Sequence, residues 1–311
     1  MQYVGNLGDW GPAQRMFEPT AFRRTAASAA LCFALFASLV PPAFAAPPAS
    51  KKAEPVHIEG YTGEAMEPFV SRDGRFLFFN TRNDPGSNTN IHFAEATDSG
   101  FTYRGVLFGT ISYDLDAVPT MAANKRFCFV SPREYRRTRV SVWCGAFDGT
   151  KVNNAVPQDG LATDRLGRLI FDVEMSADGR TMIYAEGTYS GSDVPDDADL
   201  YVAQPTPTGF TRTPDANARL TKVNSSSLEY APALSEDGLE LFFTRPTGIW
   251  PFTQPKIYRA IRGGPDQPFG KPEQLNIDGW VEGPSLAPDG TLYFHRRVEG
   301  RFQIWRQGRY G

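Results

Sequence analysis

Short apolar runs alternate with polar turns along most of the chain, and the pattern returns at a regular interval. Its form is Pro-x-x-Ser-x-Asp-Gly, followed by four or five aromatic and aliphatic residues. Five copies are present, and their Ser or Ala positions are Ser71, Ala122, Ser176, Ser235 and Ala287. These positions are 51, 54, 59 and 52 residues apart. An interval near fifty residues predicts an array of repeated supersecondary units.

Each copy has the same predicted elements. The Asp-Gly turn between two apolar runs predicts a β-hairpin, because Gly accepts a positive φ and Asp bonds to its own backbone. A third strand is expected after a longer polar loop, over 90–96, 140–146, 199–205, 256–262 and 302–308. A weaker fourth strand leads into the next copy, as at 101–109 and 210–223. Four antiparallel strands at a fixed interval are typical of a β-propeller blade.

The last copy stops at Gly311, directly after its third strand. Segment 55–63, which precedes the first copy, is expected to supply the missing strand and to close the ring without a free edge. We therefore predict an all-β chain that forms a single β-propeller of five four-stranded blades, with the N-terminal strand closing the last blade. The 25 Pro and 29 Gly fit such a turn-rich chain.

The first 45 residues have the order of a secretory signal peptide. Arg23 and Arg24 precede an apolar stretch over 26–40, and Ala43-Phe44-Ala45 is a small-x-small cleavage site. The stretch is shorter than the about 20 residues of a membrane-spanning helix, which disfavours the alternative of an uncleaved anchor. We expect residues 1–45 to be removed, with Met16 as a candidate true start. Residues 46–311 then form the mature protein, periplasmic or secreted and without a membrane span.

Two cysteines, Cys128 and Cys144, remain after the expected cleavage. They lie on predicted adjacent strands, and the midpoint between them is the centre of the joining loop. A symmetric hairpin places them opposite each other, within the reach of a disulfide. Because an exported protein meets an oxidising compartment, we predict a Cys128–Cys144 disulfide, with two buried free thiols as the alternative.

One stretch of the chain carries a family resemblance. Glu229 with Pro232, the Ser235-x-Asp237-Gly238 turn, the Leu-Phe-Phe strand that follows and the later Ile-Tyr-x-Ala strand resemble TolB-like, WD-type propeller repeats of bacterial exported proteins. The resemblance extends over all five copies, although the second has Asn124-Lys125 for Asp-Gly and the third has Val173 for the leading Pro. It implies the fold, but members of this group include binding subunits, peptidase-associated propellers and lyases.

Every copy also carries carboxylates just before or within its first strand, which lines the central channel of a propeller. They are Glu64 and Glu67, Asp114 and Asp116, Asp172 and Glu174, Glu229, and Glu282. Carboxylates around one channel mouth are candidate calcium ligands, or acid and base groups with separated pKa values. The candidate metal set is Glu67, Asp116, Asp172, Glu229 and Glu282. Their unequal offsets from the Ser or Ala positions favour separate structural hydrogen bonds instead.

Two loops offer further candidate binding residues. Arg136 and Arg137 lie in an Arg-rich loop that could clamp an anionic sugar or phosphate, although a solvated loop tip is the favoured interpretation. Trp250 and Phe252 lie on a Pro-rich loop, either as a lip for a sugar or protein or as an inter-blade plug. The chain's three His residues fall on different blades and do not suggest a zinc site.

Composition limits the class of function. A formal net charge of −3 does not favour nucleic acid, and the Gly-x-Ser-x-Gly motif of a serine nucleophile is absent. The sequence therefore favours an exported, monomeric, non-enzymatic binding or scaffold propeller that presents loops to a protein or cell-envelope glycan. The alternative is a metal-assisted hydrolase or lyase, with a carboxylate-lined channel mouth, acting on a carbohydrate or lactone. Convergence of the carboxyl groups would favour the enzyme.

Overall fold

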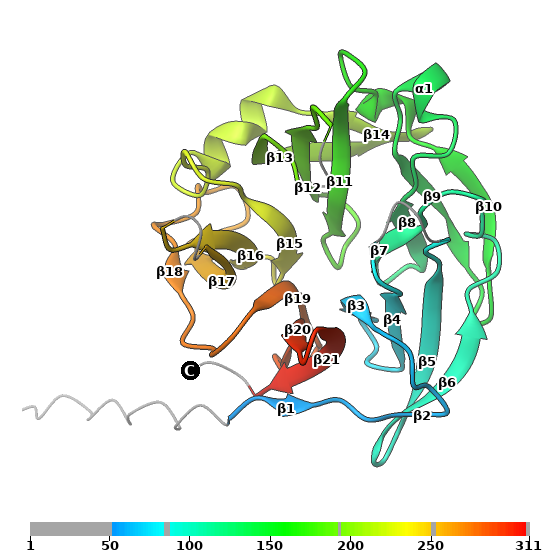
Figure 1. The fold of residues 1–311 in the computed structure, drawn as a ribbon. Coiled ribbons are helices and arrows are strands. Elements are labelled where there is room, and N and C mark those ends of the chain that lie inside the picture. Colours follow the sequence, from blue (N-terminus) through cyan, green and yellow to red (C-terminus); the bar gives the residue numbers. More distant parts are fainter. Residues whose placement is uncertain (1–51, 84–87, 192–193, 250–252, 309–311) are drawn as a thin grey trace, which may run out of the picture. The chain divides into compact units, whose positions relative to one another are not determined.

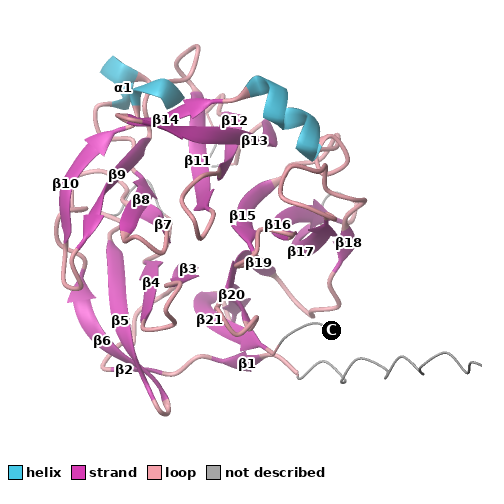
Figure 2. Ribbon diagram, turned by 180° about the vertical axis from the view of Figure 1, so that it is seen from behind, coloured by secondary structure: helices cyan, strands magenta, loops and turns pink. Residues whose placement is uncertain are grey.

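The strands of this chain form a ring of five blades around a common axis, which we call the channel axis (Figures 1 and 2). The computed structural model describes residues 52–83, 88–191, 194–249 and 253–308, all within the compact unit Pro47–Gly311. The innermost strands of these described residues contact one another in succession, and the last contacts the first. The predicted five-bladed propeller is thus confirmed.

Each blade follows the predicted hairpin order. The first blade contains β3 (Met66–Val70), β4 (Phe76–Asn80), β5 (Ile91–Thr97) and β6 (Gly100–Val106). The second contains β7 (Ala117–Met121), β8 (Arg126–Val130), β9 (Val142–Phe147) and β10 (Val152–Pro157). The third contains β11 (Arg168–Met175), β12 (Met182–Thr188), β13 (Asp197–Thr206) and β14 (Gly209–Arg212).

The last two blades complete the ring. The fourth contains β15 (Tyr230–Leu234), β16 (Glu240–Thr247), β17 (Gln254–Ile261) and β18 (Glu273–Gln274). The fifth contains β19 (Val281–Leu286), β20 (Leu292–Val298), β21 (Arg301–Gln307) and β1 (Glu54–Pro55). The described helices are short: α1 (Tyr135–Thr138) and two 3₁₀ turns, Asp159–Leu161 and Pro214–Leu220. Among the residues with described structure, no helix is long and apolar enough to cross a membrane.

The N-terminal segment closes the ring, but it does so in two steps. Glu54 and Pro55 pair with Arg306 and Trp305 of β21, which completes the fifth blade as predicted. The chain then crosses to the first blade, where β2 (Ile58–Glu59) pairs in parallel with β6. The expected closing strand is therefore divided, because the chain must reach the first blade before β3 begins. We call residues 54–59 the clasp, since they cover the edge strand β21 of the fifth blade and the edge strand β6 of the first blade.

The repeated turn explains the repeated sequence. Ser71 Oγ donates a hydrogen bond to Asp73 Oδ1 (2.5 Å) and accepts one from the backbone N–H of Phe76 (2.9 Å). The same pair of bonds occurs at Ser176 and Ser235. In the second copy Lys125 takes the glycine position with φ 70°, so the turn survives without Asp-Gly.

The predicted disulfide is present. Cys128 of β8 and Cys144 of β9 are direct partners in the ladder, with Cα atoms 4.1 Å apart, and their sulfurs are bonded. Both side chains lie in the apolar core between the second and third blades. The disulfide therefore joins the two central strands of the second blade, whose turn has Asn124-Lys125 in place of Asp-Gly.

An ion pair closes the channel near the Ser-x-Asp-Gly turns. Arg72, from the turn of the first blade, reaches across to Glu174 of β11, with Nη2 2.6 Å from Oε1. Glu174 also accepts hydrogen bonds from Thr120 Oγ1 (2.8 Å) and the backbone N–H of Leu234 (3.2 Å). Both partners of the ion pair are buried. This channel brace links four blades below the channel mouth.

Candidate active site

A β-bulge near the start of the innermost strands turns one residue toward the channel. Pairing between β3 and β4 breaks between Met66 and Phe69, and the same break occurs in β7, β15 and β19. The bulged residue has a positive φ: 47° at Glu67, 53° at Val118, 48° at Ala231 and 64° at Gly283. Such a φ costs a non-glycine residue roughly 1–2 kcal/mol, and bulges commonly re-aim side chains beside active sites.

Three carboxylates meet near these bulges, where the charges of Asp172 and Glu282 act on Glu67. Glu67 and Asp172 both lie four residues before their Ser, Ser71 and Ser176. Glu282 lies one residue before the bulged Gly283. A Cβ on Gly283 would stand 2.6 Å from Glu67 Oε2, so the Glu67 carboxyl group lies directly against the backbone that follows Glu282. We call Glu67, Asp172 and Glu282 the carboxylate cluster.

A small cavity lies on the channel axis beside this cluster. It holds about 20 Å³ and is lined by bulge residues, including Glu67, Ala231 and Gly283, and by Glu174 of the channel brace. A cavity of this size accommodates about one water molecule. The innermost strands therefore leave room for about one water molecule between the cluster and the brace.

Hydrogen-bond donors surround Glu282. Tyr230 OH donates to Oε2 at 2.8 Å, and Trp280 Nε1 donates to Oε1 at 2.8 Å. His295 Nε2 lies 3.3 Å from the same Oε1. Burial alone would raise the pKa of Glu282, but the interactions with His295, Trp280 and Tyr230 outweigh it and hold this pKa below its ordinary value. Glu282 is therefore ionised at neutral pH.

The other two carboxyl groups show the opposite behaviour. Burial, followed by the negative charges of Asp172 and Glu282, raises the pKa of Glu67 well above its ordinary value. Burial and the charge of Glu282 raise the pKa of Asp172 to about 8, against a hydrogen bond from the Ala231 N–H (2.9 Å). The Glu67–Asp172 pair therefore retains a proton at neutral pH, beside an ionised Glu282.

Two other predicted channel-mouth acids bond within their own blades. Asp116 accepts from the N–H and Oγ of Ser112 and pairs with Arg133 at 2.5 Å. Glu229 repeats this arrangement with the N–H and Oγ of Ser225 and with Arg245 at 2.7 Å. Both acids lie six residues before their Ser or Ala and are fully buried. They anchor the loops that enter β7 and β15, and they do not join the carboxylate cluster.

The described part of the chain contains no group of three or more His, Cys, Asp and Glu side chains arranged to hold a metal ion. The structure thus divides the predicted set of five ligands into a cluster and two loop anchors, and a calcium site stays a prediction. Arg136 and Arg137 are exposed on α1, where Arg137 pairs with Glu134 at 2.5 Å. Trp250 and Phe252 lie outside the described residues.

Several site residues were not predicted from the sequence. Tyr230, Trp280 and His295 were not among the predicted site residues. A signal existed in the fifth copy, where Trp280, Glu282 and Gly283 stand together just before the repeat. The common offset of Glu67 and Asp172 was a second signal.

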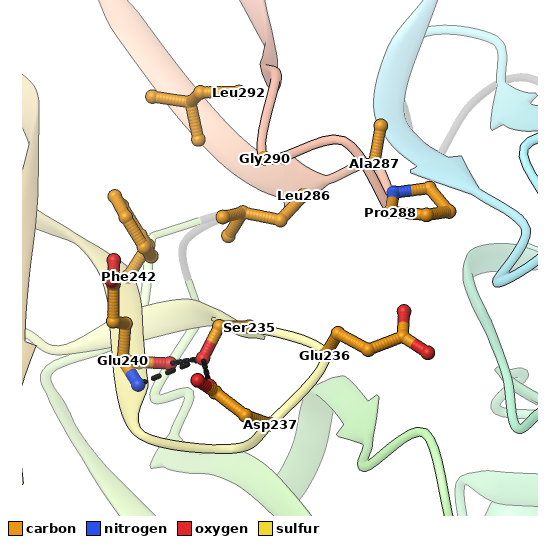
Figure 3. A pocket seen from close by; sticks show the side chains of 10 residues that line it. All are labelled: Ser235, Glu236, Asp237, Glu240, Phe242, Leu286, Ala287, Pro288, Gly290 and Leu292. Atoms are coloured by element: carbon orange, nitrogen blue, oxygen red, sulfur yellow. Dashed lines mark hydrogen bonds between the residues drawn. The ribbon is translucent and has the colours of Figure 1, made fainter. Parts of the chain in front are cut away.

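A larger cavity lies at the opposite end of the innermost strands (Figure 3). It holds about 200 Å³ between the fourth and fifth blades, with Phe242, Leu286 and Leu292 as its apolar wall. Figure 3 shows Ser235 Oγ bonded to Asp237 within the turn, at 2.6 Å. Three acidic residues line this cavity: Asp237 serves the turn, Glu240 pairs with Arg259, and Glu236 is exposed. The lining does not include the carboxylate cluster.

Comparison with known proteins supports the fold. No family model matches the chain, and no curated protein matches it significantly. Among solved structures, one described as a glycoside hydrolase has a TM-score of 0.55 and 11% identity, covering 85% of this chain and 94% of its own. A family 117 glycoside hydrolase from the marine bacterium Zobellia galactanivorans has a TM-score of 0.53 and 11% identity, covering 83% and 90%. Identity at this level shows a shared five-bladed fold, and the TolB-like resemblance stays a prediction.

Proposed function

We propose that this protein is an exported glycoside hydrolase whose carboxylate cluster carries out acid–base chemistry. One observation carries the proposal: carboxyl groups from the first, third and fifth blades meet at one channel mouth with their pKa values displaced in opposite directions. Neighbouring titratable groups with separated pKa values are the arrangement that general acid and general base roles require. A purely structural acid needs only local partners, as Asp116 and Glu229 illustrate.

The cluster has the groups that cleavage of a glycosidic bond needs. The Glu67–Asp172 pair holds a proton that can be donated to the leaving glycosidic oxygen as the bond to the anomeric carbon breaks. The ionised Glu282 accepts a proton from the attacking water, or attacks the anomeric carbon itself and is later released by water. In both routes the displaced alcohol receives one proton and the sugar receives one hydroxyl group. The distance between the reacting carboxyl groups decides between these routes.

The fold comparison supports a carbohydrate as the substrate. Glycoside hydrolases are among the solved structures that share the five-bladed ring over more than four-fifths of this chain. The half-buried Trp280, which bonds to Glu282, adds an aromatic ring at the channel mouth. Sugar rings have apolar C–H faces that pack against aromatic side chains, so Trp280 is suited to a substrate-facing role.

Export is the proposed setting for this activity. The predicted signal peptide, residues 1–45, lies outside the described residues. The disulfide between Cys128 and Cys144 supports an oxidising compartment such as the periplasm or the cell exterior. A glycan substrate outside the cytoplasm is compatible with both locations.

The test is hydrolysis of a panel of aryl glycosides and oligosaccharides by the mature protein. We expect turnover of at least one substrate, and a loss of about a hundredfold or more in Glu282→Gln, the range attributed to general acid–base groups. Glu236→Gln, an exposed acid in the turn of the fourth blade, is the matched control and should retain full activity. Absence of turnover across the panel would contradict the proposal and favour a non-enzymatic scaffold, for which glycan-array binding is the next measurement.

A further inference from the structure

His295 of β20 makes polar contacts with two members of the carboxylate cluster. Its side chain is fully buried, and its Nδ1 lies 3.2 Å from the backbone N–H of Glu67. Its Nε2 lies 3.3 Å from Glu282 Oε1. One imidazole ring thus spans the contact between the first and fifth blades, at the point where both blades present a carboxyl group.

The backbone contact fixes which ring nitrogen carries the proton. A backbone N–H is always a donor, so Nδ1 must accept and cannot itself be protonated in this arrangement. The proton of the neutral ring is therefore on Nε2, the nitrogen that faces Glu282. A ring in this state directs its Nε2–H dipole toward the Glu282 carboxylate, 3.3 Å away, and accepts a hydrogen bond from the bulged backbone of Glu67.

The surrounding residues hold the ring in this position. Phe302 of β21 packs edge-to-face on the imidazole, with ring centroids 5.5 Å apart. A Cβ at Gly283 would stand 2.6 Å from His295 Nδ1, so glycine at that bulge leaves room for the ring. The ring therefore has little freedom to turn away from either carboxylate residue.

We propose that His295 is a positioning residue, which fixes Glu67 and Glu282 relative to each other and keeps Glu282 ready to act as a base. This inference rests on the proposed glycoside hydrolase function. In this account His295 does not touch the substrate. It acts through one accepted hydrogen bond, from the Glu67 N–H, and through the 3.3 Å contact of its Nε2 with Glu282 Oε1, which lacks hydrogen-bond geometry.

The titratable and aromatic groups that face Glu282 come from several elements. They are Glu67 of β3, Asp172 of β11, Tyr230 of β15, Trp280 before β19, and His295 of β20. Tyr230 and Trp280 remain as donors when His295 is replaced. Replacing His295 should therefore change the pKa of Glu282 without removing all the polar groups around its carboxylate.

Two substitutions separate the contact of His295 with the Glu67 N–H from its contact with Glu282. The side-chain amide of His295→Asn is placed near the original Nδ1, so it can accept from the Glu67 N–H but cannot reach Glu282. The longer His295→Gln places its amide nitrogen near the original Nε2, so it can donate to Glu282 but loses the contact with Glu67. The variants therefore form a matched pair with opposite defects.

The kinetic measurement is the pH dependence of kcat/KM for an aryl glycoside. In His295→Asn the acidic limb should move upward by about one pH unit, because the buried Glu282 loses the polar contact with Nε2 that helps to keep its pKa low. In His295→Gln that limb should stay near its wild-type position. If the acidic limb lies at the same pH in both variants, and only the melting temperature falls, the positioning role is overturned and His295 is a structural histidine.

A second measurement does not depend on catalysis. Nitrogen-15 NMR of the imidazole rings reports the tautomer, and the chain has only three His residues, so His57→Gln and His92→Gln assign the spectrum. We expect His295 in the Nε2–H form at neutral pH, with its resonances altered by Glu282→Gln. An Nδ1–H form would overturn the bridge. Absence of turnover together with the Nε2–H form would refute the hydrolase while leaving the bridge intact.

Discussion

Replacing Asp172 by Asn should stabilise the protein, and more so as the pH rises. The Asn side chain keeps an oxygen to accept the Ala231 N–H, which lies 2.9 Å from Asp172 Oδ2. Asn also needs no proton to be buried, whereas Asp172 must take one up when the chain folds. Site residues that are tuned for reactivity commonly reduce stability in this way.

The size of the effect follows from the pKa. Folding raises the pKa of Asp172 from its ordinary 3.8 to about 8, mainly through burial. The folded state therefore binds the proton more tightly, and its advantage is complete below the unfolded pKa and disappears as the pH rises toward the folded pKa. Each pH unit of difference corresponds to about 1.4 kcal/mol. Asp172 is ionised in the unfolded chain at these pH values and must take up a proton on folding, which costs the wild-type protein roughly 2 kcal/mol at pH 5 and roughly 4 kcal/mol at pH 7.

Thermal melts of wild type and Asp172→Asn between pH 5 and pH 9 measure this effect. The advantage of the variant should grow by roughly 5–10 °C between pH 5 and pH 7, at about 2–4 °C per kcal/mol for a chain of this size. Asp178→Asn is the control, because the hydrogen bonds from Ser176 and the Arg180 N–H lower the pKa of Asp178 against its partial burial. That control should destabilise. A pH-independent advantage of Asp172→Asn would refute the reasoning.

Four other predictions address the frame around the site. Reducing the disulfide should lower the melting temperature by roughly 6–12 °C, because a 16-residue closure contributes roughly 3 kcal/mol; thiol labelling of both cysteines in the native protein with an unchanged melt would contradict it. Deleting the clasp from the mature protein should lower stability and produce dimers in size-exclusion chromatography, since two sheet edges become free, and a stable monomer would show that the clasp is dispensable. Arg72→Met should lower the free energy of unfolding in urea by about 3–5 kcal/mol, because Glu174 is left buried without its partner. Adding Glu174→Leu should restore most of this free energy, and a double variant no more stable than the single one would argue against the brace. Melts in calcium and in chelator should coincide if the cluster acts without a metal, and a calcium-dependent rise that Glu67→Gln abolishes would instead support the predicted calcium site.

The ring itself could be predicted because its signal is local and repeated. The Ser-x-Asp-Gly turn is specified by bonds within six residues, such as those of Ser71 with Asp73 and Phe76. The disulfide could be predicted for a similar reason, since hairpin symmetry places Cys128 opposite Cys144. The divided clasp could not, because two residues in each short strand leave no periodic pattern.

The site was only partly predictable because its members come from blades far apart in sequence. The number of residues between an acid and the Ser or Ala of its copy predicted its role better than the mere presence of an acid in the copy. Asp116 and Glu229, at offset six, bond to their own blades, whereas Glu67 and Asp172, at offset four, belong to the carboxylate cluster. The contact of His295 with Glu67 joins residues 228 apart in the chain. No local pattern reports such a contact.

The account depends most on the claim that Glu282 faces the reacting carbon of a sugar. The direct measurement is rescue of Glu282→Ala by azide or formate with an activated aryl glycoside. The variant leaves the donors of Tyr230, Trp280 and His295 around a space that a small anion fills. The account predicts a large loss of activity that either anion restores in a concentration-dependent way, while Glu236→Ala needs no rescue. An active Glu282→Ala, or an inactive variant that neither anion restores beside an active wild type, would contradict it.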